Sequence, residues 1–446
     1  MLSSLLIQME MELKMQITTF SLKRVAGIIG LALASLVFLS GCQLADMVQF
    51  SYANSVATHH WVDEAKSTTV HFELIDGHIV LPVSINGSAP LNFVLDSGAA
   101  AAVILESRHT TTLSLELGAE LPVSGVGTGP IPVARVVKDT TLSLGSVRLE
   151  DLSVIYLPLE SVPFFNNFDE VYFDGVIGAP FFERFVVEID YDRQLISFSE
   201  PDSAQARIEL RDDDWREIPL QLQSGVPYIT TQISIAPEQS VAVKLLVDTG
   251  YRGPVSLIPE THSEIHEPGE YFSTVGQGLS GDVQIKVGMS ESFSLADFEL
   301  NYVPVSYSIS GGQSDDDSNG LLGNEVLSHF NVVFDYPNER MFVKPNQQFA
   351  VPISADRSGL LIRPHRLGAV VKSIARGALG RGSELRAGDI ITSIDDTPMT
   401  RSSISKLKQL LASERETVSV CWQSGEQAYC EELALASRFE QHEGSD

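Results

Sequence analysis

The sequence predicts a mainly β protein, made of two tandem copies of one β-rich unit and a smaller α+β domain after them. Between residues 67 and 346, short apolar runs rich in Val, Ile, Phe and Thr alternate with clusters of Gly, Pro, Asn and Asp. This alternation is typical of strands separated by turns. Two phrases of sequence recur within the region, and the pattern changes near residue 350, where the last domain is expected to begin.

The composition excludes some classes of partner. The chain has 446 residues, enough for two or three domains, and 58 acidic residues against 30 basic ones. A net charge of −28 repels phosphates and anionic head groups, so nucleic acid is not expected as a partner. Because the acidic residues are spread along the chain, a solvated surface is favoured over an acidic binding face.

Residues 1–41 have the pattern of an export signal. Two basic residues precede an apolar stretch at residues 25–39, which is too short to span a bilayer comfortably. The stretch ends in Leu-Ser-Gly-Cys and resembles a bacterial lipobox, which implies that Cys42 is lipidated and begins the mature chain. Gln43, which is not Asp, then implies the outer membrane, facing the periplasm. An uncleaved signal anchor is the alternative, and Met15 is an alternative start.

Residues 42–66 are expected to be a weakly structured tether, and the two copies to occupy residues 67–205 and 206–346. In each copy an apolar run ends in Asp-(Ser/Thr)-Gly, as LNFVLDSG and as KLLVDTG. A second phrase follows well downstream, as DGVIG and as NGLLG. A duplicated unit with one carboxylate per copy can form a two-carboxylate site on a pseudo-twofold axis.

Asp96 and Asp248 are therefore the candidate catalytic pair. Two carboxyl groups that share one proton have pKa values pushed apart, so one can act as a general base on water while the other polarises a carbonyl. The sequence assigns neither role to a particular residue. Glycine allows a sharp turn beside each Asp, and a hydroxyl can hydrogen-bond across the axis. These supporting residues are Ser97, Gly98, Thr249 and Gly250.

The two turns resemble those of clan AA aspartic proteases, the retropepsin and pepsin group. The resemblance implies two retropepsin-like β-barrel lobes within one chain, in the bilobal arrangement of pepsin. It also implies that the later phrase braces each Asp turn, through Val176, Ile177, Gly178, Leu321, Leu322 and Gly323. The second copy departs from the family at Tyr251 and Arg252, and the first has a plain run of alanines. Either departure leaves open a divergent pocket or a lobe without activity.

Glycine clusters occur at matching places in both copies, and the candidate flap residues are Gly127, Gly129, Gly276 and Gly278. The second cluster matches a dinucleotide-binding motif by letter, but a strand and not a helix is expected after it. The family resemblance implies flexible flaps over the cleft. Plain glycine turns remain the alternative.

Residues 350–436 resemble a bacterial PDZ domain, most clearly in the phrase RAGDII and in a helix-like segment near residues 402–412. The resemblance implies that backbone N–H groups bind the carboxylate of a peptide C-terminus while the peptide adds a strand. The residues expected to bind it are Gly359, Leu360, Leu361 and Ile362. Residues 437–446 are expected to be disordered.

Two cysteines in this domain are placed to form a disulfide. A two-residue turn at Gly425 and Glu426 sets Cys421 opposite Cys430, at a pair of positions close enough for the bond. An oxidising periplasm permits it, and a reduced pair is the alternative.

No cofactor and no metal is expected. Residues 315–326 fit the first half of an EF-hand loop but lack its final Glu, and the paired histidines have no third ligand beside them.

The expected function is hydrolysis of periplasmic polypeptides by a lipid-anchored aspartic endopeptidase, with the PDZ domain recruiting or gating substrates. A non-catalytic peptide-binding lipoprotein is the alternative. A monomer is favoured over pairing of the halves between chains.

Overall fold

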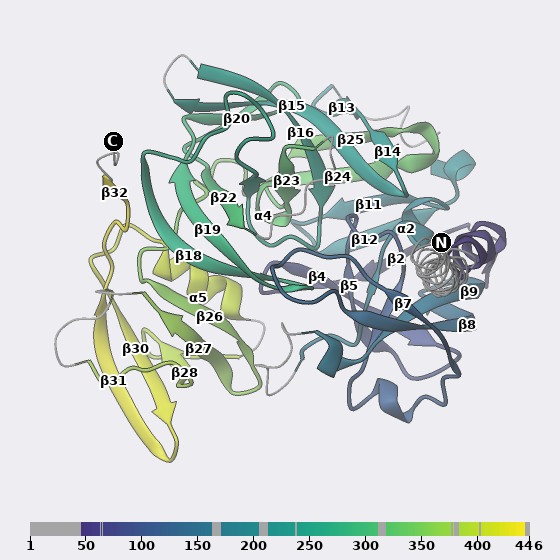
Figure 1. Cartoon of the computed structure of the whole chain (residues 1–446), viewed down its shortest axis with the longest axis horizontal. Coiled ribbons are helices and arrows are strands. Elements are labelled where there is room, and N and C mark those ends of the chain that lie inside the picture. Colours follow the sequence, from purple (N-terminus) through teal and green to yellow (C-terminus); the bar gives the residue numbers. More distant parts are fainter. Residues whose placement is uncertain are drawn as a thin grey trace, which may run out of the picture. The chain divides into compact units, whose positions relative to one another are not determined.

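The computed structural model describes the chain from residue 46 to residue 441, except residues 63, 65, 163–170, 205–212, 237–238, 311–317, 376–377, 379–382 and 401–402. The expected signal peptide, Cys42 and the last five residues lie outside the described residues. The chain divides into two compact units, residues 1–56 and residues 57–446. Figure 1 shows the described helices and strands, coloured along the sequence. In the first unit residues 46–56 are helical, where a weakly structured tether was expected.

The second unit is mainly β, as predicted, and its strands fall into two halves and a C-terminal domain. The elements of the first half are β1 (Thr58–Trp61), β2 (Ser67–His71), β3 (Glu73–Ile75), β4 (His78–Ile85), β5 (Leu91–Leu95), β6 (Val103–Leu105), η1 (Thr110–Thr112), β7 (Leu117–Pro122), β8 (Val133–Leu144), β9 (Val147–Leu157), η2 (Leu159–Ser161), β10 (Gly175–Ile177), α2 (Ala179–Phe182), β11 (Val186–Asp190) and β12 (Leu195–Ser199).

The second half follows along the chain and contains counterparts of most strands of the first. Its elements are β13 (Arg216–Pro219), β14 (Gln221–Gln223), β15 (Val226–Ala236), β16 (Gln239–Asp248), β17 (Val255–Leu257), β18 (Glu270–Gly278), β19 (Gly281–Met289), β20 (Ser292–Leu295), β21 (Phe298–Asn301), β22 (Pro304–Ser310), β23 (Gly320–Gly323), α4 (Asn324–Leu327), β24 (Phe330–Asp335), η4 (Tyr336–Asn338) and β25 (Arg340–Pro345).

Strand pairing shows the duplication directly. In the first half β10 runs parallel to β5 and antiparallel to β6, and β6 runs parallel to β9. In the second half β23 runs parallel to β16 and antiparallel to β17, and β17 runs parallel to β22. Both copies therefore place the strand that carries the downstream phrase beside the strand that leads to Asp.

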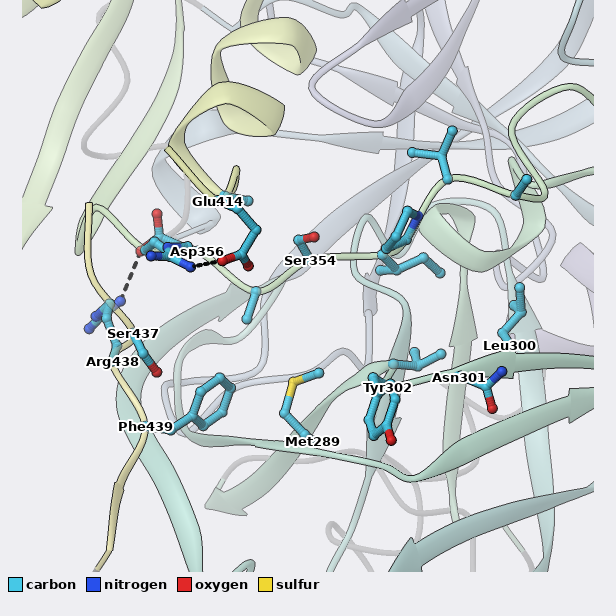
Figure 2. A pocket seen from close by; sticks show the side chains of 18 of the residues that line it. Met289, Leu300, Asn301, Tyr302, Ser354, Asp356, Glu414, Ser437, Arg438 and Phe439 are labelled. Atoms are coloured by element: carbon cyan, nitrogen blue, oxygen red, sulfur yellow. Dashed lines mark hydrogen bonds and ion pairs between the residues drawn. The ribbon is translucent and has the colours of Figure 1, made fainter. Parts of the chain in front are cut away.

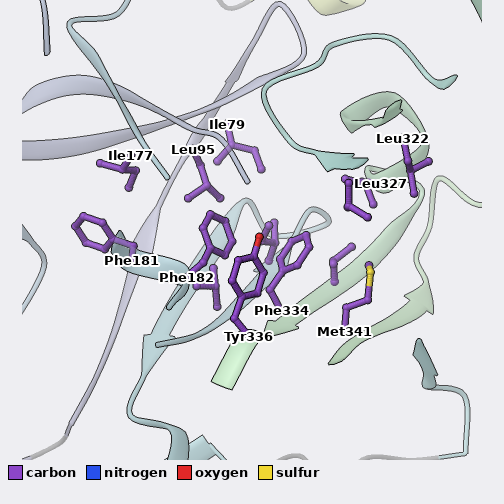
Figure 3. Packing of buried hydrophobic residues seen from close by; sticks show 14 of the residues in the cluster. Ile79, Leu95, Ile177, Phe181, Phe182, Leu322, Leu327, Phe334, Tyr336 and Met341 are labelled. Atoms are coloured by element: carbon purple, nitrogen blue, oxygen red, sulfur yellow. The ribbon is translucent and has the colours of Figure 1, made fainter. Parts of the chain in front are cut away.

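Each half has a sheet of its own, and a further sheet contains strands from both halves. Its strand order is β13-β25-β24-β11-β12-β2, and the antiparallel pair β11–β24 at its centre crosses from one half to the other. Reversing the order exchanges the corresponding strands of the two copies, so the sheet has the pseudo-twofold symmetry of the duplication. Apolar residues from both halves form one continuous core (Figure 3). At its centre Phe182 stacks on Tyr336 with ring centroids 5.1 Å apart.

Strand β1 also corrects the expected tether, because it pairs with β9 along its whole length. The reason is a contact that local sequence does not reveal. The indole N–H of Trp61 donates to the Glu200 carboxylate at 2.7 Å, and the Trp61 ring meets Phe185 edge-on at 5.5 Å.

The C-terminal domain has a sheet and a core of its own. Its sheet has the order β26-β27-β28-β30-β31, and its helix α5 covers most of the expected helical segment. The elements are β26 (Leu360–His365), β27 (Gly368–Ile374), β28 (Ile390–Ile394), β29 (Thr397–Pro398), α5 (Ile404–Leu411), β30 (Thr417–Ser424) and β31 (Gln427–Ala434).

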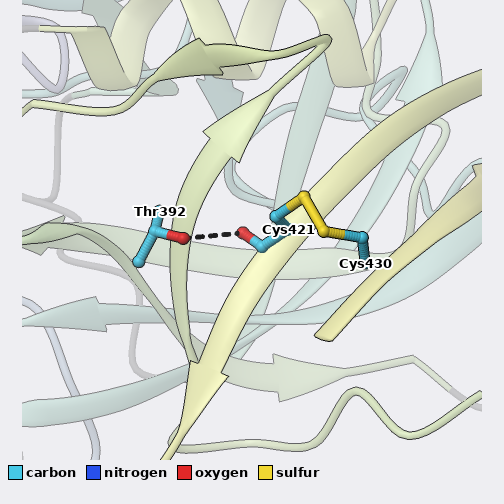
Figure 4. Close-up of a disulfide and its surroundings, with 3 residues drawn as sticks. All are labelled: Thr392, Cys421 and Cys430. Atoms are coloured by element: carbon cyan, nitrogen blue, oxygen red, sulfur yellow. Dashed lines mark hydrogen bonds between the residues drawn. A yellow bond between two sulfur atoms is a disulfide. The ribbon is translucent and has the colours of Figure 1, made fainter. Parts of the chain in front are cut away.

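A disulfide joins Cys421 and Cys430 across the β30–β31 hairpin, with Cα atoms 4.1 Å apart (Figure 4). The hairpin turns at Gly425, whose φ of 62° suits the first position of a type II′ turn. On the neighbouring strand the Thr392 hydroxyl donates to the Cys421 carbonyl at 3.3 Å.

The first part of the expected disordered tail is ordered. Strand β32 (Glu440–Gln441) pairs antiparallel with the outer strand β18. The guanidinium of Arg438 lies 4.2 Å from the centroid of the Phe272 ring on β18, and the Phe439 ring lies 5.3 Å from the same centroid. These contacts bury apolar surface that the sequence of the tail alone does not predict. Among the described residues, no helix has the length and apolarity needed to cross a membrane.

Candidate active site

The two Asp-(Ser/Thr)-Gly turns meet between the halves. Strand β5 ends one residue before Asp96, and β16 ends at Asp248. The middle residues of the turns, Ser97 and Thr249, are fully buried and bond to each other's strands. Each backbone N–H donates to the other hydroxyl, at 2.9 and 3.0 Å.

Each hydroxyl then donates to a carbonyl of the opposite strand. The Ser97 hydroxyl bonds to Val247 at 2.7 Å, and the Thr249 hydroxyl bonds to Leu95 at 2.9 Å. All four hydrogen bonds cross the pseudo-twofold axis. The position of one carboxyl group is therefore fixed relative to the other through buried, satisfied contacts.

The glycines permit the close approach of the two turns. An added Cβ at Gly98 would lie 2.9 Å from Cγ of Asp248, and one at Gly250 would lie 2.5 Å from Cγ of Asp96. Each glycine also donates its N–H to the Asp of its own turn, at 2.8 Å in both copies. The carboxyl groups lie side by side and hydrogen-bond to each other.

Electrostatics makes the pair unequal. Burial, and then the neighbouring Asp248, raises the pKa of Asp96 well above its usual value. Burial also raises the pKa of Asp248, but hydrogen bonds from Asp96 and from the N–H groups of Gly250 and Tyr251 oppose that rise. The pKa of Asp96 is therefore raised further than that of Asp248, an ordering that the sequence did not provide.

The downstream phrases brace both turns. Ile177 accepts the N–H of Asp96 at 2.9 Å, and Gly323 lies opposite Asp248 in the β16–β23 register. The glycines are required by space, because an added Cβ at Gly178 would lie 2.1 Å from the Ala99 carbonyl oxygen. At Gly323 it would lie 2.0 Å from the Gly253 carbonyl oxygen. Among the predicted bracing residues, Val176 and Ile177 pair with β5, and Leu321, Leu322 and Gly323 pair with β16. Gly178 lies against Ala99.

The departures from the family in the second turn have structural partners elsewhere. The Tyr251 hydroxyl hydrogen-bonds to Ser306, and burial raises its pKa to about 12. Arg252 forms an ion pair with Asp76, which lies on the turn between β3 and β4. Neither side chain removes the N–H groups that bond to Asp248, since those of Gly250 and Tyr251 both do so.

The residues around Asp76 also contact the second Asp turn, although no pattern in the sequence predicts it. His78 bonds through Nε2 to the Gly250 carbonyl at 3.0 Å, and its Nδ1 bonds to the Tyr172 hydroxyl. Burial, together with the charge of Arg252, lowers the pKa of His78 to about 3. A neutral His78 donates through Nε2 to the carbonyl and accepts through Nδ1 from Tyr172. No local signal marks these residues, because their partners lie far away in the sequence.

The predicted flap glycines of the two copies also come together. The Ser280 N–H donates to the Val126 carbonyl at 2.9 Å, and the Gly129 N–H donates to the Ser280 carbonyl at 2.6 Å. An added Cβ at Gly127 would lie 2.3 Å from the Ser280 carbonyl carbon. An added Cβ at Gly278 would lie equally close to the Val126 carbonyl oxygen, 2.3 Å away. The two glycine hairpins therefore meet through their backbones.

Gly276 does not take part in that contact. It lies in β18 opposite Val283 of β19, where an added Cβ would lie 2.4 Å from Cδ1 of Ile285.

The predicted peptide-binding loop of the C-terminal domain is filled by the chain itself. The Gly359 N–H donates to the Asp356 carboxylate at 2.8 Å, and the Ser358 hydroxyl bonds to the same carboxylate at 2.6 Å. Arg438 pairs with this carboxylate at 3.0 Å. The Leu360 N–H donates to the Ser358 hydroxyl at 3.1 Å, and Leu360, Leu361 and Ile362 continue as strand β26.

A cavity of about 480 Å³ lies beside this loop and is distinct from the carboxyl pair (Figure 2). Its walls include Tyr302, Asp356, Glu414, Arg438 and Phe439, and neither Asp96 nor Asp248 lines it. Among the described residues, no three His, Cys, Asp or Glu side chains gather as metal ligands would.

Comparison with known proteins agrees with the geometry of the first copy. A family model described as "Aspartyl protease" matches residues 81–181. That range contains Asp96 and the first bracing phrase, whereas Asp248 lies beyond it. A search of curated proteins found no match to the chain.

Proposed function

We propose that the protein is an aspartic endopeptidase that hydrolyses peptide bonds through a dyad of Asp96 and Asp248. The observation that carries the proposal is the pair of adjacent carboxyl groups, held by reciprocal hydrogen bonds between Ser97 and Thr249. Precise mutual positioning is what a shared-proton dyad requires. The match to an aspartyl protease family model supports peptidase chemistry.

In the proposed reaction Asp248 is the general base and Asp96 the general acid. Asp248 takes a proton from a water molecule, and the oxygen of that water bonds to the peptide carbonyl carbon. At the same time Asp96 protonates the carbonyl oxygen. The resulting diol collapses when Asp248 passes its proton to the amide nitrogen and the C–N bond breaks. Asp96 recovers its proton from the diol, so both carboxyl groups return to their starting state.

The dyad substitutions Asp96→Asn and Asp248→Asn test this function. Each should lower kcat/KM for an unstructured polypeptide by a factor of about 100 to 10,000, because one proton-transfer group is lost. A suitable control is Asp151→Asn, an exposed residue with a φ of 59°, which Asn tolerates. Cleavage at the wild-type rate by both dyad variants would exclude the mechanism.

The location of the protein in the cell and the role of its C-terminal domain are also proposed here. We infer a lipid anchor at Cys42 and an outer-membrane position facing the periplasm, on the lipobox pattern; the Cys421–Cys430 disulfide suits an oxidising compartment. The expected substrates are polypeptides. We infer that the PDZ-like domain gates them, because a peptide carboxylate entering its loop would have to displace Asp356.

The departures at Tyr251 and Arg252 favour one second candidate, a non-catalytic peptide-binding protein. It predicts that wild-type protein binds an unstructured polypeptide without cleaving it, and that Asp96→Asn leaves that affinity unchanged. Mass spectrometry of the polypeptide after incubation separates the two functions.

A further inference from the structure

A cluster of charges around the buried Asp76 carboxylate connects the C-terminal domain to the second Asp turn, although the Lys408 side chain in it is partly exposed. Asp76 is 1% exposed, and its carboxylate forms ion pairs with Arg252 and with Lys408. Arg363 is 4% exposed, and its positive charge also favours the ionised form of this carboxylate. The three cations come from three elements: the second Asp turn, helix α5 and strand β26.

The charges of the cluster depend on one another. Burial would raise the pKa of Asp76, but Arg252, Lys408 and Arg363 together lower it well below its usual range. A buried carboxylate stays ionised only when it is paired. Removing one partner leaves a charge without compensation in surroundings of low dielectric constant.

The Asp76 turn holds the backbone of the second Asp turn at more than one point. His78 bonds to the Gly250 carbonyl at 3.0 Å. The Asn324 side chain donates to the Gly77 carbonyl at 2.7 Å, while the Asn324 N–H donates to the Tyr251 carbonyl at 2.7 Å. With the ion pair of Arg252, these bonds attach residues 76–78 to residues 250–252.

The C-terminal domain is docked where this attachment occurs. Helix α5 contacts strand β3, which leads into Asp76. Strand β26 is the last strand of its sheet, yet five of its six residues are buried. Arg363 of this strand is one of the cations that act on Asp76, so β26 lies near the turn between β3 and β4.

We propose that the C-terminal domain positions the second catalytic turn, because Lys408 holds Asp76, and Asp76 holds Arg252 three residues after Thr249. The inference rests on the proposed peptidase function and makes Lys408 a positioning residue, remote from the reacting atoms. Loss of Lys408 lets the turn move, and small displacements of a catalytic group reduce the rate of the chemical step more than substrate binding.

Lys408→Met tests the proposal, with Lys406→Met as the matched control, since Lys406 is an exposed lysine on the same helix. We expect kcat to fall about tenfold in Lys408→Met while KM changes less than about twofold. Lys408→Arg, which keeps the charge, should recover most of kcat. A Lys408→Met variant with the kcat of Lys406→Met would overturn the proposal.

Amide hydrogen exchange gives a readout that does not depend on activity. In Lys408→Met the N–H groups of Gly250 and Tyr251 should exchange at least about tenfold faster than in Lys406→Met, because their turn has lost its anchor. If wild-type protein cleaves nothing, the peptidase proposal fails. The exchange rates still decide whether the C-terminal domain positions the second Asp turn. Unchanged rates in Lys408→Met contradict it. If Lys408→Met does not fold, Arg363→Gln is measured against the same control, with the same two outcomes.

Discussion

At the scale of single residues, Ser97 and Thr249 matter most because they are both buried and fully bonded. Each gives and receives hydrogen bonds across the axis, so removal of one hydroxyl leaves a buried N–H and a buried carbonyl without partners. Unsatisfied buried groups cost more than a lost bond alone. The larger rise in the pKa of Asp96 depends on this fixed geometry.

Thr249→Val should therefore lower the free energy of unfolding by about 2–4 kcal/mol, because the side chain keeps its shape but leaves buried groups unpaired. Urea denaturation measures this change. Thr249→Ser retains the hydroxyl and should lose less than about 1 kcal/mol. Equal losses in the two variants would show that the hydroxyl is not the stabilising group.

Glu325 provides a prediction about pH. Burial raises its pKa from 4.5 to about 7, although Lys408 opposes that rise. Between these values the folded protein holds a proton that the unfolded chain has released, so stability falls as the pH rises. Glu325→Gln should remove this loss and be more stable than wild type by on the order of 2 kcal/mol at pH 8.

The measurement for Glu325 is urea denaturation of both proteins at pH 5 and at pH 8. The difference between the proteins should be larger at pH 8 and small at pH 5, where Glu325 in the folded protein is protonated. A difference that does not change with pH would show that Glu325 does not titrate in this range.

At the scale of elements, the β30–β31 hairpin depends on its disulfide. The bond closes a short loop, and chain-entropy estimates for such loops give about 2–3 kcal/mol. The Cys421→Ala, Cys430→Ala double variant should therefore lower the stability of the C-terminal domain by about this amount. The fluorescence of Trp422, buried in that domain, reports its unfolding. An unchanged Trp422 transition would show that the pairing contributes no stability.

The glycine hairpins show what an element can require of a single position. At Gly127 the φ is 136° and the backbone of the second hairpin leaves no room for a side chain. Their spacing predicted hairpins in both copies. That the hairpins would bond to each other was not predictable, because neither sequence contains the geometry of the other.

At the scale of the whole second unit, one core extends through both halves, whereas the C-terminal domain has a separate core. Phe182 from the first half packs on Phe334 and Tyr336 from the second. The halves are therefore expected to unfold together. The C-terminal domain has its own stability, modified by the Asp76 cluster.

Phe182→Ala should destabilise both halves at once, by about 3–5 kcal/mol, since it leaves a cavity in the shared core. In variants that keep one tryptophan, Trp61 reports the first half and Trp215 reports the second half where it packs against residues of both. Their transitions should stay coincident in Phe182→Ala, as in the parent proteins. Separate transitions in the parent proteins would show that the halves are independent.

The sequence by itself determined the mainly β class, the duplication and the two Asp turns with their bracing phrases, since each is a local pattern. An apolar run, a turn glycine or a pair of cysteines around a two-residue turn acts over a few residues and can be recognised one segment at a time. The structure places Cys421 opposite Cys430 for that reason.

Only the tertiary structure decided that the pKa values of the two carboxyls differ, that Asp356 fills the loop at Gly359, and that the tail joins β18. It also decided that Asp76 binds Arg252, 176 residues away, and Lys408 of the C-terminal domain. Contacts over such separations depend on how whole elements pack. Burial and charge at a site are sums over those elements, and no segment of the sequence carries them alone.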